Sequence, residues 1–270
     1  WCDRQCRLCF APALWNGQDT ILKERLFGLG GNEGNHGEDV KECYYYLDST
    51  PSHSYTKALY KYPQAKFPYN GLRELNAKSG RSGPEVELAD TGIFEQGRYF
   101  DVVQEVAKRS PEDILWRITI KNQGPEAAPV HVLPMLWFRN VWKWGSERET
   151  PLRKPSLALH GEHVFASHET LGDYLFYADS PDFDEEEEWF FTENETDYPA
   201  IYGIGGPTEY VKDAFHKRLI QGQEEAVSPL PMGTKAAPHF HFMLAPGASV
   251  TVRCRLHSTL SNNGVTGLEQ

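Results

Sequence analysis

The stretch "VTVRCRL", residues 250–256, alternates between apolar and polar side chains. On an extended chain its apolar residues share one face, namely Val250, Val252, Cys254 and Leu256. The opposite face carries Thr251, Arg253 and Arg255. Because successive side chains of a strand point to opposite faces, this alternation predicts a β-strand with one face buried and the other in water.

Strand patterns of this kind recur along most of the chain. The segments interpreted as strands are 7–16, 44–49, 55–62, 99–108, 114–122, 129–140 and 250–256. Two segments containing Gly and Pro, 122–129 and 244–249, are expected to be turns that make antiparallel connections. The predicted fold class is mainly β: a large antiparallel two-sheet super-sandwich with irregular insertions and one or two short helices.

The strongest helical pattern covers residues 208–222. Thr208 is expected to cap this helix and Gly222 to end it. Its apolar face would hold Val211, Ala214, Phe215 and Leu219. The stretch 180–199 is interpreted as a loop around the acidic run Asp184–Glu188, which we expect to be solvated, with calcium binding as the minor alternative.

Composition and charge exclude several classes of protein. The 270 residues carry a net charge of −11, which disfavours binding to phosphate backbones, so no nucleic-acid partner is expected. No apolar run approaches the ~20 residues that span a bilayer, so no membrane is expected either. Five cysteines, an odd number, imply no dense disulfide framework, which favours a reducing, cytoplasmic location.

Three cysteines lie in the segment "WCDRQCRLCF", residues 1–10. Cys2, Cys6 and Cys9 form a C-x3-C-x2-C pattern that could hold a [4Fe–4S] cluster and resembles radical-SAM enzymes at this one motif. Those enzymes continue into alternating strands and helices, whereas this chain continues into antiparallel strands. Cys9 is therefore expected to be a small hydrophobic residue of the strand 7–16, and no cluster is expected.

A second metal-like pattern includes His239 and His241, which would point the same way from one strand. With Gly233 they complete G-x5-H-x-H, which resembles the first cupin motif. The acidic ligand that cupins need is missing, because Ala245 and Pro246 occupy its positions. No metal site and no cofactor are therefore expected. The chain also lacks the G-x-S-x-G motif of hydrolytic serines.

Two polar or aromatic segments are candidate binding or domain-interface regions. The glycine-rich segment 28–42 holds the first group of candidate residues: Asn35, His36, Glu38 and Asp39. It can be a surface turn, line a cleft or contact another domain. The segment 136–145 holds the second group: Arg139, Trp142 and Trp144. Its aromatic side chains can stack on sugars, or they can pack in a core or an interface.

Several longer segments together resemble one family over nearly the whole chain. They are "RLCFAPALWNGQDTILKERLFGL", "EGNHGEDVKECYYYLDSTPSHSY", "YKYPQA", "RYFDV", "SPEDILWRITIKNQGPEAAPVHVLPMLWFRN" and "LAPGASVTVR". They resemble the N-terminal region of proteins in glycoside hydrolase family 63. That family includes processing α-glucosidases and relatives that act on α-glucosides or mannosylglycerate.

The resemblance implies a domain organisation and an activity. Residues 1–270 would be a single N-terminal β-sandwich domain of a longer protein, and the catalytic (α/α)6 barrel would follow outside this chain. The barrel would hold the two carboxyl groups of an inverting hydrolase, so no catalytic residue is assigned here. We expect the chain alone to be inactive, its partners to be the barrel and an α-linked glucoside, and the segment 32–42 to face the barrel.

Two alternatives from other classes stay open. The first is a non-catalytic carbohydrate-binding module that acts through Trp142 and Trp144. The second, more remote, is a cupin-like or iron–sulfur metalloprotein. The sugar, the linkage and the oligomeric state do not follow from the sequence.

Overall fold

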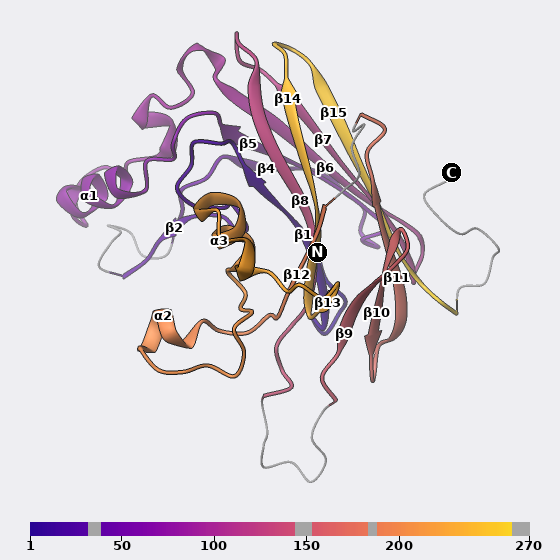
Figure 1. The fold of residues 1–270 in the computed structure, drawn as a ribbon. Coiled ribbons are helices and arrows are strands. Elements are labelled where there is room, and N and C mark those ends of the chain that lie inside the picture. The colour runs from indigo at the N-terminus through magenta and orange to yellow at the C-terminus, as the bar shows by residue number, and fades with distance from the viewer. Residues whose placement is uncertain (32–38, 144–152, 183–187, 261–270) are drawn as a thin grey trace.

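A computed structural model describes residues 1–31, 39–143, 153–182 and 188–260 of the chain. Two antiparallel sheets dominate it (Figure 1). The smaller sheet has four strands in the order β1 (Leu8–Trp15), β8 (Ala128–Phe138), β14 (Lys235–Leu244) and β12 (Glu188–Thr192). The predicted mainly β fold with antiparallel sheets is confirmed.

The larger sheet has nine strands. Their order is β13 (Met232–Gly233), β9 (Ser156–His160), β10 (His163–His168), β11 (Gly172–Asp179), β15 (Ser249–Ser258), β7 (Asp113–Asn122), β6 (Tyr99–Ser110), β5 (Tyr55–Pro63) and β4 (Tyr44–Ser49). A separate two-stranded hairpin contains β2 (Gly28–Leu29) and β3 (Asp39–Val40). The described α-helices are α1 (Tyr69–Ser79), α2 (Tyr198–Tyr202) and α3 (Ala214–Gln221), with short 3₁₀ helices at Leu88–Thr91, Glu95–Gly97 and Glu224–Ala226.

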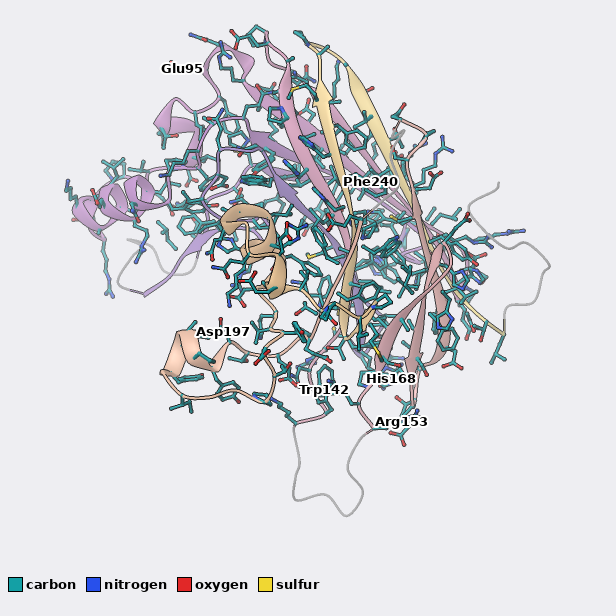
Figure 2. All side chains as sticks on the ribbon, in the orientation of Figure 1. Glu95, Trp142, Arg153, His168, Asp197 and Phe240 are labelled. Atoms are coloured by element: carbon teal, nitrogen blue, oxygen red, sulfur yellow. The ribbon has the colours of Figure 1, made fainter. Side chains whose placement is uncertain are left out.

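The main core lies between the two sheets. The strand predicted at 250–256 is confirmed, since its four apolar residues are buried in β15. The expectation that the opposite face lies in water was wrong at Arg255, which is buried and paired with Asp113. Trp116, Ile118 and Ile120 of β7 enter the same core, as do Phe10 of β1 and Phe240 of β14. Figure 2 labels Phe240, whose side chain is fully buried. Burial of these aromatic and aliphatic side chains is the main force that holds the two sheets together.

The two turns that the sequence indicated are present, but their connectivity differs from a hairpin. The turn 122–129 joins β7 of the nine-stranded sheet to β8 of the four-stranded sheet. The turn 244–249 joins β14 of the four-stranded sheet to β15 of the nine-stranded sheet. The expectation of simple antiparallel connections was wrong here, because each turn crosses from one sheet to the other instead of pairing its two strands.

Asn122 ties these two crossing turns together. Its amide nitrogen donates to the carbonyl oxygens of Glu126 (2.7 Å) and Leu244 (2.9 Å). Its amide oxygen accepts from the backbone nitrogen of Gly124 (2.7 Å) and from Gln64 Nε2 (2.6 Å). The side chain is fully buried, so these four bonds are shielded from water.

The outer face of the four-stranded sheet is also buried, because α3 lies over it (Figure 1). Ala214 and Phe215 of α3 pack against Leu133, Phe190 and Ala237 of the sheet. A sheet covered on both faces has apolar residues at successive positions, and this explains the long apolar run of β8.

The helix boundary at 208–222 differs from the prediction at its start and agrees at its end. Gly222 ends α3 with a left-handed φ of 69°, as expected. The helix begins at Ala214, however, and not after Thr208. Thr208 instead accepts a hydrogen bond from the backbone nitrogen of Tyr210 in an irregular segment. Val211 is buried outside the helix, so tertiary packing and not helical periodicity explains its position.

The stretch 180–199 is not a continuous loop. Strand β12 occupies Glu188–Thr192, with Phe190 and Phe191 buried on opposite faces of the four-stranded sheet. Helix α2 begins near its end, capped by the Asp197 side chain. The central part of the acidic run, 184–187, lies outside the described residues.

Candidate functional site

The segment 28–42 contributes only part of its candidate residues to the structure. Asn35, His36 and Glu38 lie outside the described residues. Asp39 lies in β3, which pairs with β2 so that Leu29 faces Asp39. A side chain at Gly28 would place its Cβ 2.8 Å from the Asp39 carbonyl oxygen, which explains a glycine at that position.

Asp39 belongs to a cluster of charges around Lys41. The Lys41 ammonium group is almost completely buried and lies 2.6 Å from Asp39 and 3.1 Å from Glu87, and it also contacts Glu85. Burial opposes the charge on Lys41, but these hydrogen bonds outweigh it and raise the pKa of Lys41. Among the described residues, these three carboxylates are the one set of metal-type ligands that lie together. The Lys41 ammonium group contacts all three and offsets one of their three negative charges.

A second buried network joins the next residue, Glu42, to the segment that follows β1. Glu42 Oε1 accepts from Lys23 Nζ at 2.6 Å, and Glu42 Oε2 accepts from the Tyr60 hydroxyl at 2.6 Å. The Phe27 backbone nitrogen donates to Oε1 as well. The two charged side chains are 5% and 0% exposed, so their attraction acts in a medium of low dielectric. The ring of Phe67 lies 3.9 Å from Lys23 Nζ.

Tyr69 and Asp19 extend this network. The Tyr69 hydroxyl accepts from Lys23 Nζ at 2.9 Å and donates to Asp19 Oδ2 at 2.9 Å. Burial raises the pKa of Asp19, and Lys23 offsets part of that effect. Because the charged atoms are paired with one another, the network ties the segment 19–27 to Glu42, Tyr60 and Tyr69.

Cavities lie on both sides of the segment 23–26. One of about 570 Å³ is lined by Ile21, Lys23, Arg25, Tyr69, Asp213 and His216. The other, of about 240 Å³, is lined by Pro12, Lys23, Leu26, Tyr44, Tyr46 and Gln104. A third cavity of about 630 Å³ lies near α2 and includes Asp197, which Figure 2 labels, and Lys217.

Large apolar side chains are exposed around the first two cavities. This surface, which we term the apolar edge, consists of Ile21, Leu26, Val40, Tyr44 and Tyr46. Tyr46 is 85% exposed, and the other four are between 37% and 45% exposed. Strand β4 contributes the two tyrosines and is the outermost strand of the nine-stranded sheet. An apolar surface on an open sheet edge marks a contact site for protein or ligand.

The aromatic segment 136–145 has a structural role where it is described. The indole nitrogen of Trp142 donates to Glu195 Oε1 at 3.0 Å, and the ring packs against the main core. Glu195 Oε2 accepts from Asn140 (2.8 Å) and pairs with Lys143 (2.6 Å). The backbone nitrogen of Arg139 donates a hydrogen bond to the carbonyl oxygen of Arg7. Trp144 lies outside the described residues.

Trp142 is therefore not a free platform for a sugar ring. Its polar edge is occupied by Glu195, and its ring is partly buried against apolar side chains. The interpretation of this tryptophan as a packing residue, which the sequence left open, agrees with these contacts. Trp142 is labelled at the lower end of the molecule in Figure 2.

The two histidines of the cupin-like motif have a third histidine beside them. His131 of β8 lies opposite His241 of β14, and its ring stacks on His241 with centroids 4.1 Å apart. The ring of His239 stacks on the His131 ring from 5.1 Å, and His131 Nδ1 lies 2.8 Å from His239 Nε2. These rings lie nearly parallel, and the three histidines are not among the convergent ligand sets of the described residues. The arrangement is a stack and not a preformed metal site.

Gly233 of the same motif has a packing explanation. A Cβ at this position would lie 2.3 Å from the carbonyl oxygen of Thr192. Strand β13 therefore approaches β12 too closely for any side chain at Gly233. The match to the cupin motif arises from a close backbone contact and from a stack of imidazoles.

The histidine stack is expected to make the fold sensitive to acid. Burial, with the neighbouring His241 and His239, lowers the pKa of His131 to about 3. Burial and His241 and Arg218, opposed by Glu188, lower the pKa of His239 to about 4. In the unfolded chain both groups take up protons near pH 6.5. Stability is therefore complete above pH 6.5 and falls as the pH decreases towards 4, by at most about 1.4 kcal/mol per pH unit for each histidine.

Urea unfolding at a series of pH values measures this effect. The double variant His131→Phe with His239→Phe keeps aromatic rings in the stack and removes their titration, so its stability should vary less between pH 6.5 and 4. His53→Asn is the control, because His53 is exposed and asparagine tolerates its positive φ of 53°. If the stability of the double variant and that of the parent change identically with pH, His131 and His239 are not the cause of the acid sensitivity.

The sequence did not indicate the Lys23–Glu42 network, the Lys41 cluster or His131. Their members are distant in the chain, as with Asp19 and Tyr69, and no local pattern links them. The polarity of the segment 28–42 was the only available signal. It correctly directed attention to Asp39, Lys41 and Glu42, although the latter two were not assigned as site residues.

Comparison with known proteins gives one relative in sequence. No protein-family model matches the chain. The chain is 39% identical, over an alignment of 292 residues, to an uncharacterized protein, YMR196W, from Saccharomyces cerevisiae. The alignment covers 97% of this chain and 27% of the yeast protein, so the chain spans about a quarter of the length of its relative.

Two solved structures are similar in shape at low sequence identity. A candidate aldose 1-epimerase from Escherichia coli K12 has a TM-score of 0.37 and 11% identity, covering 92% of this chain and 82% of its own. A polysaccharide lyase has a TM-score of 0.37 and 8% identity, covering 93% of this chain and 25% of its own. At these TM-scores the likeness carries no argument about this chain. No helix of the described residues is long and apolar enough to cross a membrane.

Proposed function

We propose that this chain is the N-terminal β-sandwich domain of an inverting, α-glucosidase-like glycoside hydrolase of family 63. In this proposal it packs on a C-terminal (α/α)6 barrel that carries the catalytic acid and base, and it contributes to the rim of the sugar-binding site. The antiparallel sandwich agrees with the fold expected of such a domain. The alignment leaves about three quarters of the yeast relative outside the matched region, which is room for a second domain in a protein of that kind.

The apolar edge is the observation that carries the proposal. Its five side chains lie on the surface, although burying them would be favourable by roughly 25 cal/mol per Å² of apolar surface. Contacts between domains of one chain cover surfaces of this kind. The β4 edge also presents backbone groups that have no neighbouring strand among the described residues, so a docked domain would shield them.

The two buried networks supply the rigidity that such an interface needs. Lys41 and Glu42 follow β3 directly, and their ion pairs fix this segment to the Glu85–Glu87 region and to Lys23. Leu26 and Val40 of the apolar edge are exposed, and each is adjacent in sequence to a residue of these networks, Phe27 or Lys41. Asn35, His36 and Glu38 of the segment 28–42 lie outside the described residues. These three residues are proposed as rim residues only.

The reaction in this proposal belongs to the barrel. One carboxylic acid protonates the leaving oxygen while one carboxylate activates a water molecule on the opposite face of the sugar. Each buried carboxyl group among the described residues has a partner: Lys23 for Glu42, Tyr69 for Asp19, Arg255 for Asp113, Lys143 for Glu195 and Lys217 for Asp197. They are therefore not proposed as the acid and base. We expect the purified 270-residue chain to hydrolyse no α-glucoside.

The alternative of an autonomous carbohydrate-binding module has less support. It depended on Trp142 and Trp144 as a stacking surface, and Trp142 is committed to Glu195 and to the core. The metalloprotein alternative relied on the histidine pair and on the cysteines. The His131–His239–His241 stack does not converge on a metal position.

The test compares a triple variant in the full-length protein and in the 270-residue chain. Leu26→Ser, Tyr44→Ser and Tyr46→Ser together remove three of the five side chains of the apolar edge without removing a main-core residue. In the full-length protein we expect a fall in thermal stability of several degrees and a loss of about ten-fold or more in kcat/KM for an α-glucoside. The same changes should leave the melting temperature of the 270-residue chain nearly unchanged.

Met243→Ser is the matched control, since Met243 is 63% exposed on β14 and is not part of the apolar edge. If the triple variant and this control have the same melting temperature and the same kcat/KM in the full-length protein, the apolar edge is not the interface. Turnover of an α-glucoside by the 270-residue chain alone would refute the assignment of catalysis to the barrel.

A further inference from the structure

The three cysteines near the start of the chain lie together in one turn. Trp1 and Phe10 exchange two backbone hydrogen bonds of 2.8 Å, and the Asp3 nitrogen donates to the Leu8 carbonyl oxygen. Cys2 and Cys9 face each other between these hydrogen-bonded positions, as partners of an antiparallel bridge. Side chains of such a pair lie on the same side of the ladder, so Cys2 and Cys9 are neighbours.

The turn that links them brings Cys6 to Cys2. The Asp3 carboxylate accepts hydrogen bonds from the backbone nitrogens of Gln5, Arg7 and Leu8, which fixes the turn. Cys6 adopts a left-handed backbone with a φ of 53°, a conformation that a residue of this type seldom takes. In this position the Sγ atoms of Cys2 and Cys6 are 3.2 Å apart.

A metal site explains this geometry less well than a pair of thiols does. Tetrahedral zinc places each thiolate about 2.3 Å from the metal, which requires several sulfur atoms to converge on one point. Among the described residues, the three cysteines are not a set whose ligand atoms all lie within 4.8 Å of one another. Cys9 Sγ instead points to the Cys6 carbonyl oxygen, at 3.7 Å. The close contact is between Cys2 and Cys6 alone.

We propose that Cys2 and Cys6 are a reversible dithiol–disulfide site that exchanges with low-molecular-weight disulfides such as oxidised glutathione. Cys6 is exposed and reacts first: its thiolate attacks one glutathione sulfur, the S–S bond of glutathione breaks, and one glutathione thiolate leaves. The Cys2 thiolate then attacks Cys6 Sγ and releases the second glutathione. Two protein thiols lose two electrons, one glutathione disulfide gains them, and both thiol protons end on glutathione.

Cys9 is a neighbour and not a member of this pair. Burial raises the pKa of Cys9 to about 12, and the nearby Cys2 and Cys6 add to this effect. Burial also raises the pKa of Cys2, so the geometry distinguishes the two thiols: Cys2 Sγ lies 3.2 Å from Cys6 Sγ, whereas Cys9 Sγ is directed at the Cys6 carbonyl oxygen. Cys254 is buried in β15 and serves as an internal thiol that small disulfides do not reach.

The sequence itself makes the test clear. Arg4 lies between Cys2 and Cys6, and Arg7 lies between Cys6 and Cys9, so trypsin separates the three cysteines into different peptides. The full chain is equilibrated in buffers of increasing oxidised-to-reduced glutathione ratio, free thiols are alkylated, and the digest is examined by mass spectrometry. We expect a disulfide to link the peptide ending at Arg4 to the peptide Gln5–Arg7. The amount of this linked peptide should rise about ten-fold or more over the series of buffers.

Two variants define the outcome. Cys9→Ser should leave the amount of the linked peptide within about two-fold, and Cys6→Ser should abolish it. Return to reduced glutathione should restore both alkylated peptides. The proposal is overturned if Cys6 carries only glutathione at the highest ratio, or if a link between Cys2 and Cys9 dominates in the unsubstituted chain. Circular dichroism confirms that each variant keeps its β structure.

Discussion

Replacing Asn122 by alanine is expected to lower the free energy of unfolding by about 4 kcal/mol, because four buried hydrogen-bonding partners lose their bonds at once. Two of these partners are the carbonyl oxygens of Glu126 and Leu244, one in each crossing turn. The other two are the donors of Gly124 and Gln64. A small cavity adds to the loss, since the Asn122 side chain is fully buried.

Urea unfolding followed by tryptophan fluorescence measures this change. The neighbouring substitution Gln123→Ala is the matched control: Gln123 is partly exposed and makes one side-chain bond, to Asp101. We expect Gln123→Ala to cost less than about 1 kcal/mol. A loss for Asn122→Ala no larger than that of Gln123→Ala would show that the two turns hold together without this amide.

Replacing Glu42 by leucine is the second change with a large expected effect. It leaves the Lys23 ammonium, the Tyr60 hydroxyl and the Phe27 nitrogen without their common acceptor. Removing one partner of a buried ion pair costs about 3–5 kcal/mol, because the remaining charge stays in a medium of low dielectric. The free energy of unfolding of the 270-residue chain should fall by an amount in that range.

A second substitution distinguishes the lost ion pair from poor packing of the new side chain. Adding Lys23→Met to Glu42→Leu removes the unpaired charge, and replacing both members of a buried pair by apolar residues is often close to neutral. The double variant should therefore recover the part of the loss that the unpaired charge causes, although the Tyr60 hydroxyl and the Phe27 nitrogen still lack their acceptor. Arg98→Ala, which breaks an exposed pair with Glu126, should have no detectable effect. A double variant as unstable as Glu42→Leu would exclude the buried charge as the cause.

The strands were predictable because the alternation of apolar and polar residues shows which side chains of a strand are buried. Val252 and Ile118 alternate with polar neighbours, and both are buried in the main core. The connectivity of the turns was not predictable in the same way. A turn such as 122–129 has the same composition whether it closes a hairpin or crosses between sheets, and Asn122 reveals its role only through partners as distant as Leu244.

The remaining errors in the fold have local causes. Strand β12 was missed because Glu188 belongs to both the acidic run and the strand, so charge concealed the apolar residues that follow. The start of α3 was placed too early because Val211 fits the helical period, although it is buried in the irregular segment before the helix. Neither feature is fixed by its own residues alone, since contacts with the four-stranded sheet decide both.

The candidate site was predictable only as a region. The polarity and the glycines of the segment 28–42 indicated a place where the chain is specialised, and Asp39 does lie in a cluster of charges. Their partners Lys23 and Glu85 come from other segments, and sequence spacing cannot identify them. Trp142 shows the opposite difficulty: aromatic density predicted a surface for ligands or a packing residue, and only the contact with Glu195 favours packing.

The order of strands has a consequence for synthesis of the protein. In the nine-stranded sheet, β15 lies between β7 and β11 and is the strand that joins the two halves. In the four-stranded sheet, β14 lies between β8 and β12 in the same way. During synthesis the four-stranded sheet therefore cannot be complete before residue 244 has been made, and the nine-stranded sheet cannot be complete before residue 258. Because pairing of strands that are distant in the chain is slow, we expect both layers to close only near the end of the translation of this segment.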